Sequence, residues 1–298
     1  MTRVMPAAVL SRDEWLTTAS LHQETVEELT RAARERKQRG ESHPIEDFMW
    51  TYYSQRPTQF MKWHPGAGVE LKDAAEYVGE RGYTVSNGVA AVSADFISQR
   101  AEALRWIAEL QHNMSEREPR FACFGLHEWA MVYRLEQSQV RHESAPLRLS
   151  PAEIASVVEA QELKCTHYDA FRFYVPQARS LNHMLLQRED QINNEQPGCL
   201  HANMDLYKWC YKAAPVVSSE LMVRAFMLAR DIRTLDMQAA PYDLRAWGHE
   251  PVRIETADGR AEYVRRQREF HDRGQVLRAE LIQQISAALH LIDEDRAD

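Results

Sequence analysis

The stretch Ser93-Ala-Asp-Phe-Ile-Ser-Gln-Arg-Ala-Glu-Ala-Leu-Arg-Trp-Ile-Ala-Glu-Leu-Gln111 shows most plainly how this chain folds. Its apolar residues recur at steps of three and four, which is the spacing of one buried face of an α-helix. Two capping boxes, Ser11 with Glu14 and Ser150 with Glu153, indicate the starts of two further helices. Helical patterns also cover 201–212, about 219–237 and roughly 259–291. The sequence therefore predicts a mainly α protein.

Two stretches depart from the helical pattern. Gly79 and Gly82 interrupt residues 69–87, which predicts a short strand or hairpin there. Residues 252–256 alternate apolar and polar side chains, which predicts a second short strand. We expect one compact helical domain over 1–298 with one or two short β segments, in which a helical subregion 1–112 packs on 113–298.

Composition narrows the class of protein. The 298 residues include 36 Lys and Arg against 44 Asp and Glu, a net charge of −8 with histidine neutral. A chain of this sign does not coat nucleic acid or anionic membranes non-specifically, although a local basic face stays open. No stretch approaches the ~20 apolar residues of a membrane span, and the N-terminus lacks a signal-peptide pattern. The four cysteines, Cys123, Cys165, Cys199 and Cys210, form no C-x-x-C pair and predict buried free thiols. We expect a cytoplasmic protein with no membrane partner.

The apolar segment 121–133 carries the first candidate site, His127 and Glu128. Adjacent side chains on a helix diverge by ~100°, so the two should not chelate one ion together. One would face a site while the other makes a structural hydrogen bond. Residues 230–237 contain Asp231 and Asp236, five positions apart. We interpret that segment as a partly solvated helix end with local ion pairs.

Two further segments combine histidine with carboxylates. His167 and Asp169 share a face if their segment is extended. His201 and Asp205 stand at i and i+4 on one helical face, a spacing that suits two metal ligands or a simple hydrogen bond. Each segment is therefore a candidate for a ligand site or for a buried structural network.

Several longer strings point to a family. They are His43-Pro-Ile-Glu-Asp-Phe48, Thr51-Tyr-Tyr-Ser-Gln-Arg-Pro57, Phe124-Gly-Leu-His-Glu-Trp129, Cys199-Leu-His-Ala-Asn-Met-Asp-Leu-Tyr-Lys-Trp209 and Leu235-Asp-Met-Gln-Ala-Ala-Pro-Tyr-Asp243. With these strings, which cover most of the chain, the sequence resembles a bacterial family, common in actinobacteria, that carries the name 3-methyladenine DNA glycosylase. The chain lacks the helix-hairpin-helix and the helical repeats of two other glycosylase classes.

The resemblance implies excision of alkylated purines from DNA. Such an enzyme flips the base into an aromatic pocket and uses a carboxylate to stabilise the sugar cation. The candidate carboxylates are Asp205, Asp169 and Glu128. The candidate pocket residues are Trp50, Tyr52, Tyr53, Arg56, Phe171, Phe173 and Trp209. The candidate phosphate contacts are Arg31, Arg34, Arg36, Lys37 and Arg39. This interpretation needs no cofactor.

The residues also support two other functions. In the first, His127, His167, His201 and Asp205 converge inside a helical bundle and bind Fe, Mn or Zn. The protein would then be an oxygenase or hydrolase of a small-molecule substrate. In the second, the aromatic pocket binds a small planar ligand without catalysis.

Overall fold

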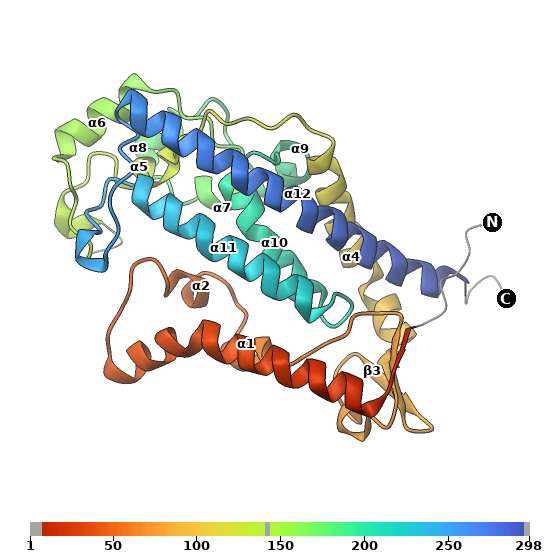
Figure 1. Ribbon diagram of the computed structural model, residues 1–298. Helices are drawn as coiled ribbons and strands as arrows, with labels where there is room; N and C mark the ends of the chain where they lie inside the picture. Colours follow the sequence, from red (N-terminus) through yellow and green to blue (C-terminus); the bar gives the residue numbers. More distant parts are fainter. Residues whose placement is uncertain (1–7, 141–143, 295–298) are drawn as a thin grey trace.

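A computed structural model describes residues 8–140 and 144–294 of the chain. Helices make up 60% of it, which confirms the predicted mainly α class. The long helices are α1 (Arg12–Arg39), α4 (Ala94–Ser115), α10 (Leu200–Ala213), α11 (Ser219–Ala239) and α12 (Ala257–Glu294). Figure 1 shows α10, α11 and α12 side by side, with α4 packed against α12 and α1 running along the far side of α11.

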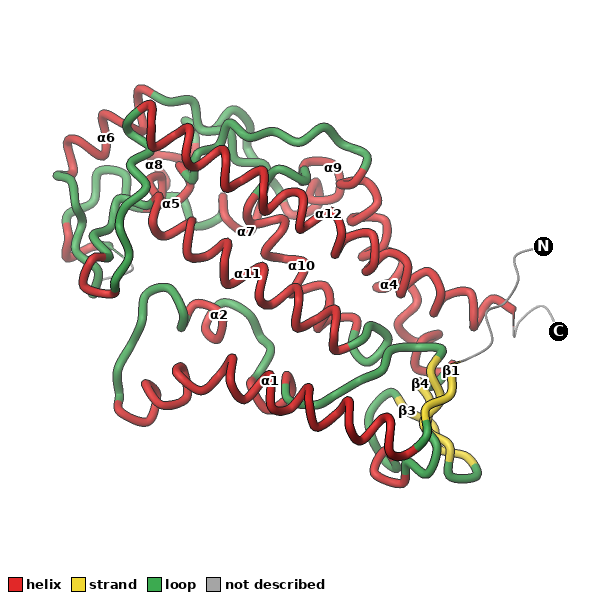
Figure 2. Tube along the Cα trace, viewed as in Figure 1, coloured by secondary structure: helices red, strands yellow, loops and turns green. Residues whose placement is uncertain are grey.

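Short helices fill the connections between the long ones. They are α2 (Phe48–Thr51), α3 (Pro57–Phe60), α5 (Leu126–Met131), α6 (Pro151–Ala160), α7 (Tyr168–Phe171), α8 (Pro176–Arg179) and α9 (Gln191–Asn194). Four 3₁₀ turns lie at Ala75–Tyr77, Gln137–Gln139, Arg188–Asp190 and Arg245–Trp247. The short helices α5, α7 and α9 surround the start of α10, where several candidate residues lie (Figure 2).

A small sheet lies at one end of the molecule (Figure 2). Its strands are β1 (Ala8–Leu10), β2 (Val69–Leu71), β3 (Tyr83–Ser86) and β4 (Val89–Val92), in the order β1-β2-β4-β3. The pair β1–β2 is parallel, and the other two pairs are antiparallel. The expected β structure in 69–87 is therefore present, because Asn87 and Gly88, both with positive φ, form the tight turn of a β3–β4 hairpin.

The strand expected at 252–256 is wrong. Val252 and Ile254 are buried, but the segment is a turn, and the N–H of Val252 donates to the carbonyl of Gln238. The alternation reflects a loop anchored on the end of α11, not pairing with another strand.

One apolar core connects most of the chain. It runs from Val26 in α1 to Ile292 in α12, and so it crosses the expected subregion boundary at residue 112. A second, smaller core holds the sheet against the start of α1 through Trp15, Trp63 and Leu71. No helix in the described ranges combines the length and the apolar character needed to cross a bilayer.

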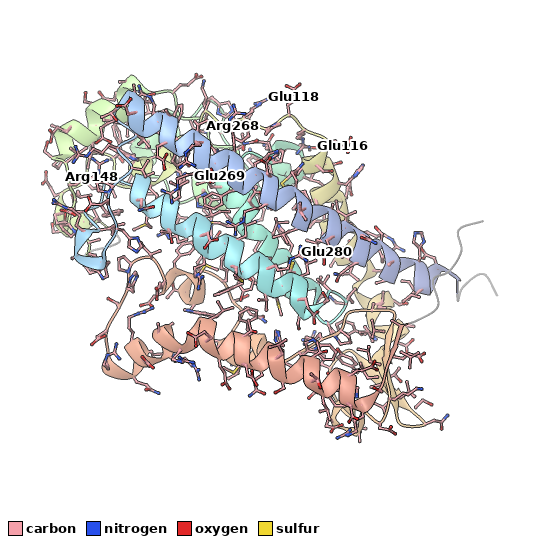
Figure 3. The ribbon with its side chains drawn as sticks, in the orientation of Figure 1. Glu116, Glu118, Arg148, Arg268, Glu269 and Glu280 are labelled. Atoms are coloured by element: carbon pink, nitrogen blue, oxygen red, sulfur yellow. The ribbon has the colours of Figure 1, made fainter. Side chains whose placement is uncertain are left out.

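Ion pairs hold α12 near its middle and just before its start. Figure 3 labels Glu280, which pairs with Arg224 of α11 at 2.7 Å, and Arg148, which pairs with Glu255 just before α12 begins. The Arg148 guanidinium also lies 5.3 Å from the ring centre of Trp129 in α5. These contacts hold α5 and α11 in position beside α12.

Candidate metal centre

A pocket of about 420 Å³ opens where α2, α5, α7, α10 and α11 meet. Its inner wall includes His201 of α10 and Glu128 of α5, and its aromatic side includes Phe48, Tyr52 and Phe173. The remaining lining residues are Ser42, His43, Pro44, Asp47, Thr51, Met131, Ser144, Asp169, Ala170 and Arg233. This volume lies within the ordinary range for small-molecule sites.

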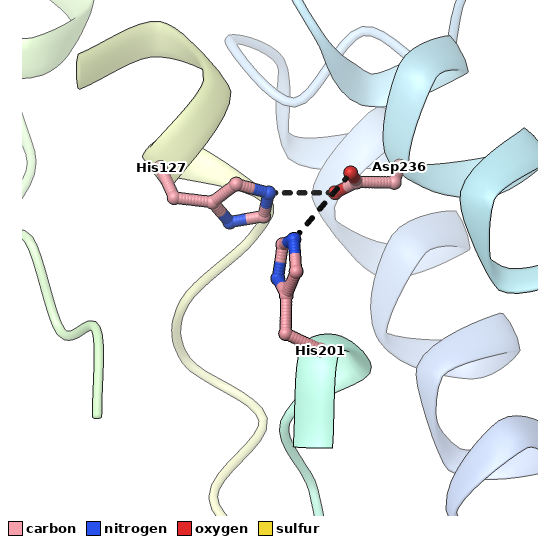
Figure 4. Close-up of side chains that lie close together, drawn as sticks. All are labelled: His127, His201 and Asp236. Carbon is pink, nitrogen blue, oxygen red and sulfur yellow. Dashed lines mark ion pairs between the residues drawn. The ribbon is translucent and has the colours of Figure 1, made fainter. Parts of the chain in front are cut away.

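Three buried side chains converge at the inner end of this pocket. His127 comes from α5, His201 from the first turn of α10, and Asp236 from the last turns of α11 (Figure 4). We call these residues the His–Asp cluster. One ligand atom from each lies within 4.8 Å of the others. Two imidazoles and one carboxylate at this spacing can ligate a single transition-metal ion.

The closest pair in the cluster is His127 and Asp236. The His127 Nε2 lies 2.7 Å from the Asp236 Oδ1, an ion pair when the ring is protonated, and neither atom has a well-aligned hydrogen-bond partner within the described part of the chain. Buried polar atoms rarely lack a partner in a native protein. Two ligands that bind one ion at ~2.1 Å are about 3 Å apart at right angles and ~3.4 Å apart in a tetrahedral site. The pair is therefore near the spacing of neighbouring metal ligands and would open by a few tenths of an ångström to hold an ion.

Charge in the cluster also suits a cation. Burial, together with His127, lowers the pKa of His201 well below its usual value and keeps the ring neutral. Burial alone would raise the pKa of Asp236, but His127, His201 and Arg233 outweigh it and hold the pKa below its usual range. Burial alone would lower the pKa of His127, but Asp236 outweighs it and raises the pKa above its usual value, so a metal ion would displace a proton from this ring. A neutral imidazole and an ionised carboxylate are the forms that bind metal. The His127 and His201 rings meet edge to face, with centres 4.3 Å apart.

Arg233 joins the cluster to the pocket wall. Its NH1 donates to Glu128 Oε1 at 2.7 Å and to Asp236 Oδ2 at 2.9 Å. Its guanidinium lies 4.1 Å from the ring centre of Phe48. His127 and Glu128 thus face different partners, as their adjacent positions on a helix require. Arg233 orients the carboxylate of Asp236 through its second oxygen.

A second buried network lies behind the cluster. His167 Nε2 is 3.1 Å from Asp205 Oδ2 and 3.3 Å from Glu195 Oε1, and Lys208 forms ion pairs with Asp205 and Asp169. The N–H of Ala170 donates to His167 Nδ1, so the proton of that ring is on Nε2. The His167 ring is stacked on His201, with centres 5.4 Å apart. We call these residues the Lys208 network.

The structure sorts the predicted metal ligands into two groups. His127 and His201 belong to the His–Asp cluster, whereas His167 and Asp205 belong to the Lys208 network. Asp236 takes the position that the sequence assigned to Asp205. The interpretation of 230–237 as a partly solvated helix end is wrong for Arg233 and Asp236, which are 1% and 0% exposed. The signal missed in the sequence is the i, i+3 spacing of these two charges among buried apolar residues of α11.

The predicted substrate residues are divided between three places. Tyr52, Phe173, Glu128 and Asp169 line the pocket. Trp50, Tyr53 and Arg56 line a neighbouring groove on the other side of α2. Phe171, Trp209 and Asp205 lie in neither and are buried; Trp209 packs on Trp106 with ring centres 5.2 Å apart.

Cys165, Cys199 and Cys210 are buried free thiols, while Cys123 is partly exposed.

Comparison with known proteins gives no match. No family model, no curated protein and no solved structure matches this chain. The side chains of the pocket and of the two buried networks are therefore the features that indicate a function.

Proposed function

We propose that this protein is a metal-dependent enzyme that holds a divalent ion of iron, manganese or zinc on His127, His201 and Asp236. The observation that carries the proposal is the convergence of these three ligand atoms, within 4.8 Å, at the inner end of a pocket. Two imidazoles and one carboxylate leave coordination positions open for substrate or water.

His201 connects the ion to the substrate. It is the member of the cluster that also lines the pocket, so a molecule in the pocket lies next to the open coordination positions. A bound iron would supply oxygen activation, and a bound zinc would supply a water of lowered pKa. Arg233 and Glu128 would hold the Asp236 carboxylate in its orientation.

The pocket favours a small planar substrate. Phe48 and Tyr52 are stacked with ring centres 4.8 Å apart, and Phe173 also lines the pocket. Its carboxylates are compensated, because Asp47 pairs with Arg36, Glu128 with Arg233, and Asp169 with Lys208. We therefore expect a substrate without a strong net charge.

The test is metal content, measured by inductively coupled plasma mass spectrometry on protein purified without chelator. We expect a near-stoichiometric transition metal in the wild type and its loss in His201→Ala and Asp236→Asn. Asp231→Asn is the matched control, because Asp231 lies on the same helix but pairs with Arg273 at the surface. A metal-free wild type whose Tm does not rise on addition of Fe²⁺, Mn²⁺ or Zn²⁺ would contradict the proposal.

DNA glycosylase activity remains the second candidate. It is supported by the family resemblance and by one feature of the pocket, which combines aromatic rings with the carboxylate of Asp169 in a space that fits one purine. The phosphate contacts expected along α1 are less well supported than the pocket, because several of these cations are already paired. Arg31, Arg36 and Arg39 each pair with a carboxylate. Base release from alkylated DNA in the presence of EDTA, abolished by Asp169→Asn, would favour this candidate over the metalloenzyme.

A further inference from the structure

A second cavity lies on the other side of α2. It is a groove of about 900 Å³ between the C-terminal half of α1 and residues 50–58. Arg34 and Lys37 line it from α1, and Trp50 and Arg56 line it from the opposite side. Asp47 and Thr51 belong to the walls of both the groove and the pocket, so α2 separates the two.

Three cations in this groove have no carboxylate partner among the residues that the structure describes. Arg34, Lys37 and Arg56 are exposed, and none forms an ion pair within the described part of the chain. Arg34 donates a long bond of 3.4 Å to the backbone carbonyl of Glu27. The two carboxylates in the groove wall, Glu41 and Asp47, pair with Arg39 and Arg36 respectively. The groove therefore concentrates uncompensated positive charge in a chain whose net charge is −8.

The groove also offers an aromatic surface. Trp50 is partly exposed, and its ring packs on Phe226 with centres 5.3 Å apart, which fixes its position. Thr30, Ser54 and Thr58 add hydroxyl groups to the wall. A tryptophan beside arginine and lysine is a combination that stacks on a nucleobase and neutralises a phosphate.

We propose that this groove binds a nucleotide, with the phosphate between Arg34, Lys37 and Arg56 and the base against Trp50. The proposal goes beyond the metal-dependent function and does not require the ion. It also gives a role to Arg34, Lys37, Trp50 and Arg56, which the His–Asp cluster leaves unused.

The test compares adenosine 5′-monophosphate with adenosine by isothermal titration calorimetry, in EDTA and at low salt. We expect the nucleotide to bind at least about tenfold more tightly than the nucleoside, since one charged contact accounts for roughly that factor. The triple variant Arg34→Ala/Lys37→Ala/Arg56→Ala should bind the nucleotide at least ~30-fold more weakly. Trp50→Leu should reduce nucleotide binding to the level of ribose 5-phosphate.

The matched control removes the same charge elsewhere. Arg31→Ala/Arg134→Ala/Arg265→Ala deletes three exposed arginines that pair with carboxylates outside the groove, and it should leave binding within about twofold. Equal loss in both triple variants would show non-specific attraction and overturn the proposal. A Kd weaker than ~1 mM for the wild type would also overturn it.

One further variant separates the groove from the metal centre. His201→Ala should retain nucleotide binding, because His201 does not line the groove. Binding that disappears in His201→Ala but survives in the groove triple variant would place the ligand in the pocket and refute the proposal. A short oligothymidylate measured in parallel identifies the kind of ligand. Tighter binding than the mononucleotide would indicate a nucleic-acid strand, and weaker binding would indicate a free nucleotide.

Discussion

Lys208 shows how single residues carry the buried charge of this protein. The side chain is 9% exposed, and its ammonium pairs with both Asp205 and Asp169. Burial alone would lower the pKa of Lys208, but the two carboxylates outweigh it and raise the pKa above its usual value. Removal of the cation would leave Asp205 with His167 and Asp169 with the exposed Arg172 and Arg188. Loss of the ammonium from between two buried carboxylates is costly in a medium of low dielectric constant.

We therefore expect Lys208→Met to lower the free energy of unfolding by about 3–5 kcal/mol, measured by urea denaturation. Lys212→Met is the matched control, since both ammonium groups lie near the ring of Trp209 but only Lys208 has buried carboxylate partners. Its effect should stay below ~1 kcal/mol. Equal losses in the two variants would show that the Trp209 contact, not the carboxylates, gives Lys208 its importance.

Asp205 belongs to the same buried network as Lys208. Because it lies outside the pocket and is bonded to Lys208 and His167, its replacement acts through these partners. Asp205→Asn combined with Lys208→Met should cost less than the sum of the two single changes, because the pair is removed together. Additive losses, measured by a double-mutant cycle, would contradict a coupled network.

At the scale of elements, α12 positions the start of α10 through a close contact. Gly274 of α12 faces Asn203, and a Cβ at this position would overlap the Asn203 amide oxygen. Asn203 has little freedom to move. Its Nδ2 donates to the carbonyls of Pro197 and Cys199, and its Oδ1 accepts from Arg278 at 2.9 Å. The contact therefore fixes the first turn of α10, which carries His201.

We expect Gly274→Ala to destabilise the protein by about 1–2 kcal/mol despite the better helix propensity of alanine. The propensity gain is ~1 kcal/mol, and overpacking against a fixed side chain costs roughly 1–3 kcal/mol or more. Ala279→Gly, at an exposed position of the same helix, measures the propensity difference alone. Increased stability of Gly274→Ala in thermal or urea unfolding would show that Asn203 moves aside easily.

Features that depend on local spacing could be predicted from the sequence, and features that depend on packing between helices could not. The helix at 93–111 was predictable because its apolar spacing is local, and it appears as α4. The alternation at 252–256 was misleading, because burial in an anchored loop gives the same pattern as a strand. The pairing of His127 and His201 with Asp236 depends on how α5, α10 and α11 pack. Asp205 lies four positions after His201, a spacing that suits two metal ligands. Its carboxylate instead pairs with Lys208 and His167.

At the scale of the whole molecule, the sheet and the helical bundle meet at residues 63 and 64. The N–H of His64 donates to the Ser219 Oγ at 2.8 Å, and the His64 carbonyl accepts from the N–H of Ser219. Trp63 Nε1 donates to Glu220 at 2.8 Å. These bonds join the smaller core to the start of α11. The His64 ring makes a further hydrogen bond, of 2.9 Å, between its Nδ1 and the hydroxyl of Tyr83 in β3.

Protonation of His64 should weaken this junction. Burial, reinforced by Lys62 and His22, lowers the pKa of His64 from 6.5 to about 4. Between these values the unfolded chain binds a proton that the folded protein does not. The contribution of His64 to the free energy of unfolding is therefore fully present above pH ~6.5. It decreases as the pH falls toward 4, by up to about 3 kcal/mol for a ring that is partly exposed.

The measurement is the free energy of unfolding of wild type and His64→Gln across that pH range. Glutamine keeps a hydrogen bond to Tyr83 but does not titrate, and the carboxylates that titrate in the same range are common to both proteins. The difference between the two curves should change by about 2–3 kcal/mol between pH 7 and pH 4, and it should be constant above pH 7. Parallel curves would mean that solvent reaches the ring and that the junction does not depend on its charge. A difference of the opposite sign would mean that the folded protein stabilises the protonated ring, which the burial of His64 beside Lys62 argues against.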